Sequence, residues 1–254
     1  MVVAAASIAL VLVVVAVVGL LAPAQPSSSD SSQDASPGTN LAGITVPAQA
    51  APPALAANPG PGFSGQVDLR WARDVAAATG IPERAVVGYA AGALGAEHYF
   101  PGCGIGWNTL AGIGRIESDH GRHGGGVIDE TGLVLPLIFG VQLDGDGVQN
   151  IPDTDGGAYD EDAEFDRAMG PMQFIPRTWI SWAVDANGDL NPDPHNINDA
   201  ALAAGDYLCF MSGGMSTEEG YLAGIAAYNA GEAYLRNVTE AAQRYGDAAA
   251  SATD

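Results

Sequence analysis

The sequence contains no lysine, and its nine basic residues are all arginine. Thirty acidic residues give a formal net charge of −21 over 254 residues. A chain this acidic repels polyanions, which excludes nucleic acid as a partner and leaves only the apolar N-terminal segment for membrane contact. Between Glu117 and Asp199 the acidic residues far outnumber the three arginines, Arg122, Arg167 and Arg177. This stretch is either a solvated acidic face or a region that holds cations.

Cysteine is also scarce, because Cys103 and Cys209 are the only two. Neither lies near the N-terminus, which excludes anchoring as a lipoprotein. The four histidines include no H-x-x-x-H pair, so zinc is not expected. In an exported protein an even number of cysteines favours a disulfide between Cys103 and Cys209, and two buried free thiols are the alternative.

The N-terminus differs in composition from the rest of the chain. Residues 2–22 are almost wholly apolar, which is at the threshold for spanning a bilayer, and Ala22-Pro23-Ala24 resembles a signal cleavage site. We expect residues 1–24 to be either a signal peptide or an uncleaved anchor, and both place the remainder outside the cytoplasm. Residues 25–66 are rich in Pro, Ala, Ser and Gly, which predicts a disordered linker.

From residue 67 onward the apolar residues recur at helical spacing, and no stretch alternates with period two. We therefore expect a mainly α domain over residues 67–246, followed by a short tail at 247–254. Helices are expected within residues 67–80, 81–99, 106–121, 168–184, 198–211, 216–231 and 232–246. Residues 121–166 show no clear periodicity, which predicts a long irregular loop with a short β-hairpin around Leu133–Leu143.

Glu117 is the first candidate for chemistry. It follows Ile116 at the end of an apolar helix, and a glycine-rich loop comes directly after it. The helix dipole disfavours a negative charge at this end, so helix stability does not explain the residue. Shielding by apolar neighbours such as Trp107 and Ile113 would raise the pKa of the Glu117 carboxyl, which suits a general acid near neutral pH. A surface glutamate at a helix end is the alternative.

Two further segments carry polar groups suited to a sugar. In "AMGPMQFIPRTW", Gln173 offers an amide that both donates and accepts hydrogen bonds, and Met172 offers an apolar wall. In "AAYNAG", Tyr228 and Asn229 end an apolar helix. Each segment alone is also explained by packing or by a helix C-cap.

Together the three segments resemble the lytic transglycosylases with a lysozyme-like fold. That resemblance is carried by Glu117-Ser118, by Gly170-Pro171-Met172-Gln173 and by Ala227-Tyr228-Asn229, in this order. The strings "GRIESDHGRHGG", "DRAMGPMQFIPRTW" and "DPHNINDAALAAGDYLC" look like the membrane-bound transglycosylase B type in its actinobacterial form. The resemblance covers roughly residues 67–245 and implies a goose-type lysozyme fold.

The resemblance also implies a substrate and a mechanism. The substrate is the peptidoglycan glycan strand, cut between N-acetylmuramic acid and N-acetylglucosamine, and no cofactor is needed for catalysis. Glu117 protonates the leaving oxygen and then acts as a base toward the muramic 6-hydroxyl, which closes a 1,6-anhydro ring. Ser118, Met172, Gln173, Tyr228 and Asn229 are expected to contact or position the sugar. We expect a monomer that remodels the cell wall.

Two alternatives remain open at this point. Asp119 or another acid of the loop could be a second carboxylate, which would make the protein a hydrolytic muramidase. The domain could also be a wall-binding module without catalytic activity, although such a module has no need of Glu117.

Calcium is expected as a structural ion on the pattern "DANGDLNPDPHNIND". Asp185, Asn187 and Asp189 stand at positions 1, 3 and 5 of an EF-hand-like loop, and Asn191 could add a backbone carbonyl. Position 12 is not the usual glutamate, but Asp199 at position 15 resembles the closing acid of the longer loop in some transglycosylases of this type. An Asx-rich turn that caps the next helix is the alternative.

Overall fold

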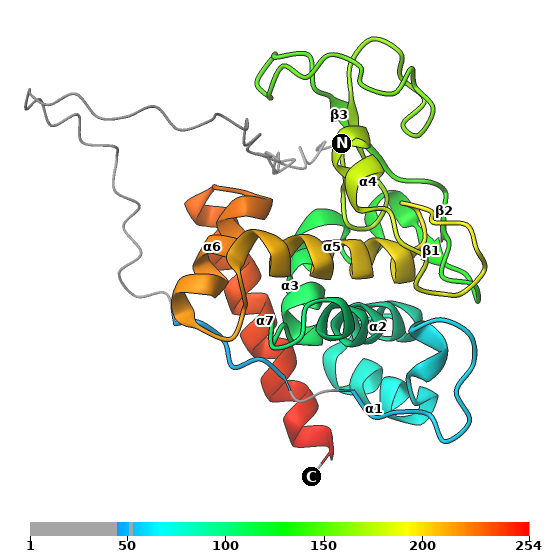
Figure 1. Cartoon of the computed structure of the whole chain (residues 1–254), viewed down its shortest axis with the longest axis vertical. Helices are drawn as coiled ribbons and strands as arrows, with labels where there is room; N and C mark the ends of the chain where they lie inside the picture. The colour runs from blue at the N-terminus through cyan, green and yellow to red at the C-terminus, as the bar shows by residue number, and fades with distance from the viewer. Residues whose placement is uncertain (1–44, 51–52, 254) are drawn as a thin grey trace, which may run out of the picture.

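The computed structural model describes residues 45–50 and 53–253, and Figure 1 shows their arrangement. Helices are the main secondary structure among them, which confirms the expected mainly α class. The α-helices are α1 (Leu69–Thr79), α2 (Glu83–Tyr99), α3 (Trp107–Ser118), α4 (Pro176–Trp182), α5 (Ile197–Ser212), α6 (Glu218–Tyr228) and α7 (Glu232–Thr253). Two 3-10 segments, η1 (Ser64–Gln66) and η2 (His123–Gly125), precede α1 and follow α3.

Small residues let the central helices approach closely. A Cβ atom added at Gly92 of α2 would lie 2.7 Å from the carbonyl oxygen of Ala201 on α5. One added at Gly112 of α3 would lie 2.7 Å from the carbonyl oxygen of Val238 on α7. In Figure 1, β3 and α4 lie above α5, whereas α1, α2 and most of α7 lie below it. Helix α3, which carries Glu117, is therefore held between α2 and α7.

Four short strands interrupt the helices. β1 (Val127–Ile128) pairs with β2 (Val134–Leu135), and β3 (Phe139–Gln142) pairs with β4 (Arg167–Met169), both antiparallel. A hairpin is thus present in the long loop, but it spans Val127–Leu135 and does not join Leu133 to Leu143. β2 stops before Pro136, which has no backbone N–H to extend the ladder, and β3 finds its partner beyond the acidic loop.

The ends of the expected domain differ from the structure. Residues 1–24 and most of the expected linker lie outside the described residues. Residues 45–50 and 53–66, however, are hydrogen-bonded to the domain: Asn108 of α3 accepts from Ala50 N at 2.9 Å, and Ser64 N donates to Ala186 O at 3.0 Å. Helix α7 runs on to Thr253, through the expected tail, since the alanine-rich sequence after Gly246 is a strong helix former.

The two cysteines form a disulfide, as expected. The Cα atoms of Cys103 and Cys209 are 5.6 Å apart, and the bond joins the segment before α3 to the last turns of α5. Among the described residues, no helix is both long enough and apolar enough to span a bilayer.

Candidate active site

Glu117 lies in the last turn of α3, where its side chain is half-buried. Burial raises the pKa of the Glu117 carboxyl from its ordinary value of 4.5 to about 8. The hydroxyl of Tyr234, on α7, donates a hydrogen bond to Glu117 Oε1 at 2.6 Å and lowers this pKa, but burial has the larger effect. The carboxyl is therefore mostly protonated at neutral pH, which is the state that a general acid requires.

The chain turns sharply away from Glu117 because three consecutive residues adopt left-handed conformations. Asp119, His120 and Gly121 have φ values of 51°, 60° and 79°. His120 fixes this turn to the core. Its ring is fully buried, and its two nitrogens are hydrogen-bonded to the hydroxyls of Tyr89 at 2.9 Å and Tyr245 at 2.8 Å. Burial lowers the pKa of His120 to about 3, so the ring is neutral and serves to fix the end of α3.

Ser118 joins the end of α3 to the second predicted segment. Its hydroxyl donates to the carbonyl of Pro171 at 2.7 Å and accepts from Gly121 N at 2.8 Å. The side chain is buried, at 2% exposure. Ser118 therefore connects two segments, and this geometry leaves its hydroxyl committed to the protein.

The Gly170–Gln173 turn depends on close packing. A Cβ atom at Gly170, where φ is 69°, would lie 1.9 Å from the carbonyl oxygen of Pro194, so a larger residue does not fit. Gln173 itself has a φ of 53°, and its amide nitrogen donates to Gly170 O at 2.9 Å. Its side chain is half-buried and keeps hydrogen-bonding capacity beyond this contact.

The third predicted segment, which contains Tyr228 and Asn229, is hydrogen-bonded to the second. The hydroxyl of Tyr228 donates to the carbonyl of Met172 at 2.7 Å, and Asn229 Oδ1 accepts from Gly231 N at 2.9 Å. Tyr228, Asn229 and Met172 are buried, with exposures of 5%, 3% and 0%. The structure thus brings all three predicted segments together, but Ser118, Met172 and Tyr228 mainly hold the site in shape and offer little surface to a sugar.

Tyr234 is the site residue that the sequence reasoning missed. It stands in the first turns of α7, where a tyrosine is equally well explained as a core residue. Its contact with Glu117 arises only because α3 and α7 pack side by side, although the two residues are 117 positions apart. In the sequence Tyr234 is marked only by its position five residues after Asn229, and this spacing alone does not predict a contact with Glu117.

Asp119 points into a different environment from Glu117. Its carboxylate forms ion pairs with Arg115 and with Arg122, the latter at 2.9 Å. The hydrogen bond from Arg122 and the charges of both arginines hold the pKa of Asp119 below its usual value, against the effect of partial burial. Asp119 follows the last residue of α3 in a left-handed conformation, and both arginines engage its carboxylate, so it is not placed as a partner carboxyl for Glu117.

The predicted calcium loop is present, but its carboxylates are occupied by backbone amides. Asp185 accepts from Gly188 N and Leu190 N, and Asp199 accepts from Ala186 N at 2.8 Å and Asp193 N at 3.0 Å. Asn187 and Asp189 bond to each other, and Asn191 N donates to Asp189. The next helix is capped by Asn196, whose side chain accepts from Asn198 N.

The donor set of this loop suits calcium chemically, since it consists of carboxylate and amide oxygens. Burial, with smaller contributions from the charges of Asp185 and Asp189, raises the pKa of Asp199 to about 7, so a cation would relieve the repulsion. Among the described residues, however, the carboxylates whose oxygens gather within 4.8 Å of one another are those of Asp153, Asp155 and Asp166 in the acidic loop. Calcium at 185–199 stays a prediction.

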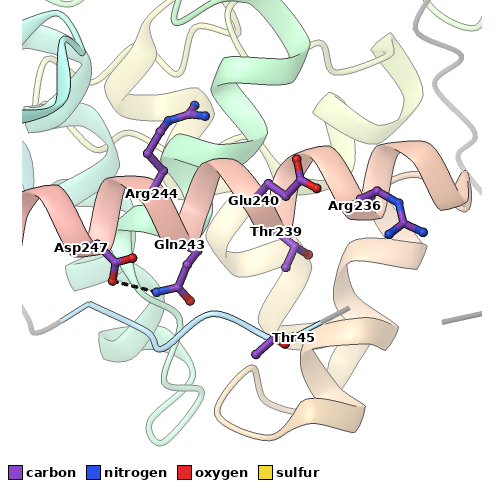
Figure 2. A pocket seen from close by; sticks show the side chains of 7 residues that line it. All are labelled: Thr45, Arg236, Thr239, Glu240, Gln243, Arg244 and Asp247. Atoms are coloured by element: carbon purple, nitrogen blue, oxygen red, sulfur yellow. Dashed lines mark hydrogen bonds between the residues drawn. The ribbon is translucent and has the colours of Figure 1, made fainter. Parts of the chain in front are cut away.

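A separate pocket on α7 lies away from these residues. Its volume is about 580 Å³, and Figure 2 shows the side chains of α7 and Thr45 that line it. Its lining is polar and mixed in charge, with Arg236, Arg244 and Asp247 among the side chains. None of the predicted site residues contributes to it.

Comparison with known proteins gives one match. Residues 164–244 match the family described as the Transglycosylase SLT domain. No curated protein and no solved structure matched the chain. The matched segment contains Gln173, Tyr228, Asn229 and Tyr234 but begins after Glu117. The chain is mainly helical with two small antiparallel sheets. Together with the family match, this architecture identifies a lysozyme-like fold.

Proposed function

We propose that the protein is a lytic transglycosylase that cuts the β-1,4 bond between N-acetylmuramic acid and N-acetylglucosamine in peptidoglycan. The family match over residues 164–244 supports the enzyme class, and the resemblance of the segment around Glu117 supports the membrane-bound B type in its actinobacterial form. The observation that carries the proposal is the placement of Glu117, half-buried in the last turn of α3 and hydrogen-bonded by Tyr234, with its pKa raised by burial to about 8.

In the proposed reaction Glu117 begins protonated. Its carboxyl gives the proton to the glycosidic oxygen, the bond from that oxygen to the muramic C1 breaks, and the N-acetylglucosamine side leaves as an alcohol. The substrate's N-acetyl group stabilises the positive charge that develops at C1. Glu117, now a carboxylate, removes the proton from the muramic 6-hydroxyl, whose oxygen bonds to C1. Glu117 is protonated again and no water is consumed.

The surrounding residues support this sequence of steps. Tyr234 stabilises the carboxylate that exists between the two proton transfers, because its hydroxyl donates to Oε1. Gln173 is the partly accessible amide beside the site and is the residue that we assign to sugar recognition. Ser118, Met172, Tyr228 and Asn229 act by positioning the segments that carry Glu117 and Gln173.

The product decides between this function and hydrolysis. Digestion of purified peptidoglycan followed by mass spectrometry should give muropeptides that end in 1,6-anhydro-N-acetylmuramic acid, each lighter by one water than the hydrolytic product. Reducing ends alone would identify a muramidase. The interpretation as a binding module is tested by Glu117→Gln, which should abolish cleavage and retain binding to the glycan. Cleavage by this variant would refute the assignment of Glu117.

We also propose that the enzyme works outside the cytoplasm as a monomer that remodels the wall, with residues 1–24 as the exported leader or anchor. Calcium remains part of the proposal as a structural ion at Asp185, Asn187, Asp189, Asn191 and Asp199. Binding would require these side chains to exchange their backbone partners for the ion. Thermal unfolding with calcium and with EGTA tests this, since an unchanged melting temperature would remove the metal from the proposal.

A further inference from the structure

A second pocket, of about 640 Å³, lies at the start of α2. One wall is formed by residues 56–65, which the sequence had assigned to the linker. The opposite walls come from Arg84 of α2, Thr131 of the β1–β2 hairpin and the Asn187–Asp189 loop. Its volume is in the range of sites that hold small ligands. Glu117 and the residues around it do not line this pocket.

Arg84 is the unusual residue of the pocket. Within the described part of the chain, no carboxylate lies within 4 Å of its nitrogens, although the protein has 30 acidic residues. Its Nε is buried and makes no hydrogen bond. Most of the other arginines form an ion pair or stack on a ring: Arg73, Arg115, Arg122, Arg167, Arg236 and Arg244. A buried donor without a partner destabilises the folded protein, so its retention calls for an explanation.

Helix stability does not provide that explanation. Arg84 is the second residue of α2, where the helix dipole disfavours a positive side chain. Pro82 precedes the helix and supplies no side-chain cap to its first turn. The positive end of a 17-residue helix and an unpaired guanidinium thus occur together, and both favour a negative group in the pocket.

The same pocket also contains two carboxylates, Asp68 and Asp189. Asp68 caps α1 by accepting from Arg70 N and Trp71 N, and Asp189 accepts from Asn191 N and from the amide of Asn187. These bonds hold the carboxylates in place, away from Arg84. A ligand with two or more negative charges would be repelled by them, whereas a ligand with one carboxylate and one ammonium group would complement both sides.

We propose that this pocket binds the charged end of an amino acid or short peptide, with the ligand carboxylate on Arg84 and its ammonium group toward Asp68, which lies outside the proposed calcium loop. The planar guanidinium matches a carboxylate through two parallel N–H···O bonds, which lysine cannot reproduce. This inference does not depend on the proposed transglycosylase activity, because the two sites share no residue.

Calorimetric titration of the full chain at pH 7 with L-alanyl-L-alanine tests the proposal. We expect saturable binding. The N-acetylated dipeptide and the C-terminal amide should each bind at least about tenfold more weakly, since each lacks one charged group. Inorganic phosphate should also bind more weakly than the dipeptide. No saturable binding, equal binding of the blocked dipeptides, or phosphate bound as tightly as the dipeptide would each overturn the proposal.

Variants of the arginine locate the site. Arg84→Gln should weaken binding at least about tenfold, whereas Arg177→Gln should leave it unchanged, because Arg177 is an exposed arginine of α4 that also lacks an ion pair. Circular dichroism checks that each variant is folded. If Arg84→Gln does not fold, Arg84→Lys keeps the charge and loses the paired N–H groups, and it should still weaken binding several-fold. Binding unchanged in the folded variant would refute the role of Arg84.

Discussion

The hydrogen bond between Tyr234 and Glu117 gives the most direct test of the proposed chemistry. Its donor favours the ionised carboxylate and lowers the pKa of Glu117, which burial raises to about 8. Tyr234→Phe removes the donor and keeps the ring, so this pKa should rise. A hydrogen bond to a charged group contributes roughly 1.5–3 kcal/mol, and one pKa unit corresponds to about 1.36 kcal/mol. The expected rise is therefore on the order of one to two units.

The assay is the pH dependence of kcat/KM for release of soluble muropeptides, which reports the ionisation of the free enzyme. Glu117 must be protonated to start the reaction, so activity should fall as pH rises through about 8 in the natural protein. In Tyr234→Phe this fall should move to higher pH. The activity on the acidic side of the fall should decrease, because the variant no longer stabilises the carboxylate formed after the first proton transfer.

Tyr221→Phe is the matched control for this experiment. Tyr221 is a buried tyrosine like Tyr234, but its hydroxyl lies 3.4 Å from that of Thr239 and does not contact the Glu117 carboxyl. Its removal should leave the position of the alkaline fall unchanged, whatever it does to stability. A fall that stays in place or moves to lower pH in Tyr234→Phe would refute the reasoning. A shift of equal size in Tyr221→Phe would also refute it.

Three further predictions concern stability. Asp206 is buried without a hydrogen bond to Oδ1, and burial raises its pKa from 3.8 to about 7, so the neutral form that suits this site is lost as pH rises through 7. Asp206→Asn should therefore raise the melting temperature at pH 8 but not at pH 4. Asp74→Asn, at an exposed position, is the control and should not show this difference. Reduction of the disulfide, which links residues 106 positions apart, should cost up to about 5 kcal/mol of unfolding free energy, and an unchanged urea midpoint would contradict this. Gly170→Ala should lower the melting temperature and the activity far more than Gly147→Ala, which has a similar positive φ but open space around it.

The helical class was predictable from local patterns, and so were the place of Glu117 at the end of a helix and that of Gln173 at a turn. Apolar spacing indicates a helix wherever it occurs, and glycine marks its end, as at Gly80, where φ is 73°. Boundaries were less certain. The segment expected to be helical begins at residue 216, but in the structure α6 begins at Glu218 with Thr217 as the cap, accepting from Gly220 N.

Contacts between distant segments were not predictable, since nothing local specifies them. Tyr234 reaches Glu117 only through the packing of α7 on α3, and β3 pairs with β4 only after the acidic loop has folded back. Ser118 shows a different limit. A serine beside a catalytic acid suggests contact with substrate, yet its hydroxyl is taken by Pro171, because the turn beyond Gly170 packs directly against the end of α3.

The linker shows why average composition can mislead at a domain edge. Residues 45–50 carry few large apolar side chains, but two polar side chains hold them in place. Gln49 Oε1 accepts from Gly106 N at 2.7 Å and from Thr109 Oγ1 at 2.8 Å, which ties this segment to the start of α3. Asn108 bonds to the backbone of Ala48 and Ala50 in the segment and to Ala242 on α7.

These contacts connect the N-terminal segment to α3, the helix that carries Glu117. The segment that links the domain to the apolar N-terminus binds the first turn of α3, and Glu117 stands in the last turn of the same helix. A boundary drawn at residue 66 would remove Gln49 and leave the Gly106 amide and the Thr109 hydroxyl without this acceptor, at a cost of about 1 kcal/mol per hydrogen bond. We therefore propose that the functional domain includes residues 45–50, because they hold the start of the helix that carries Glu117.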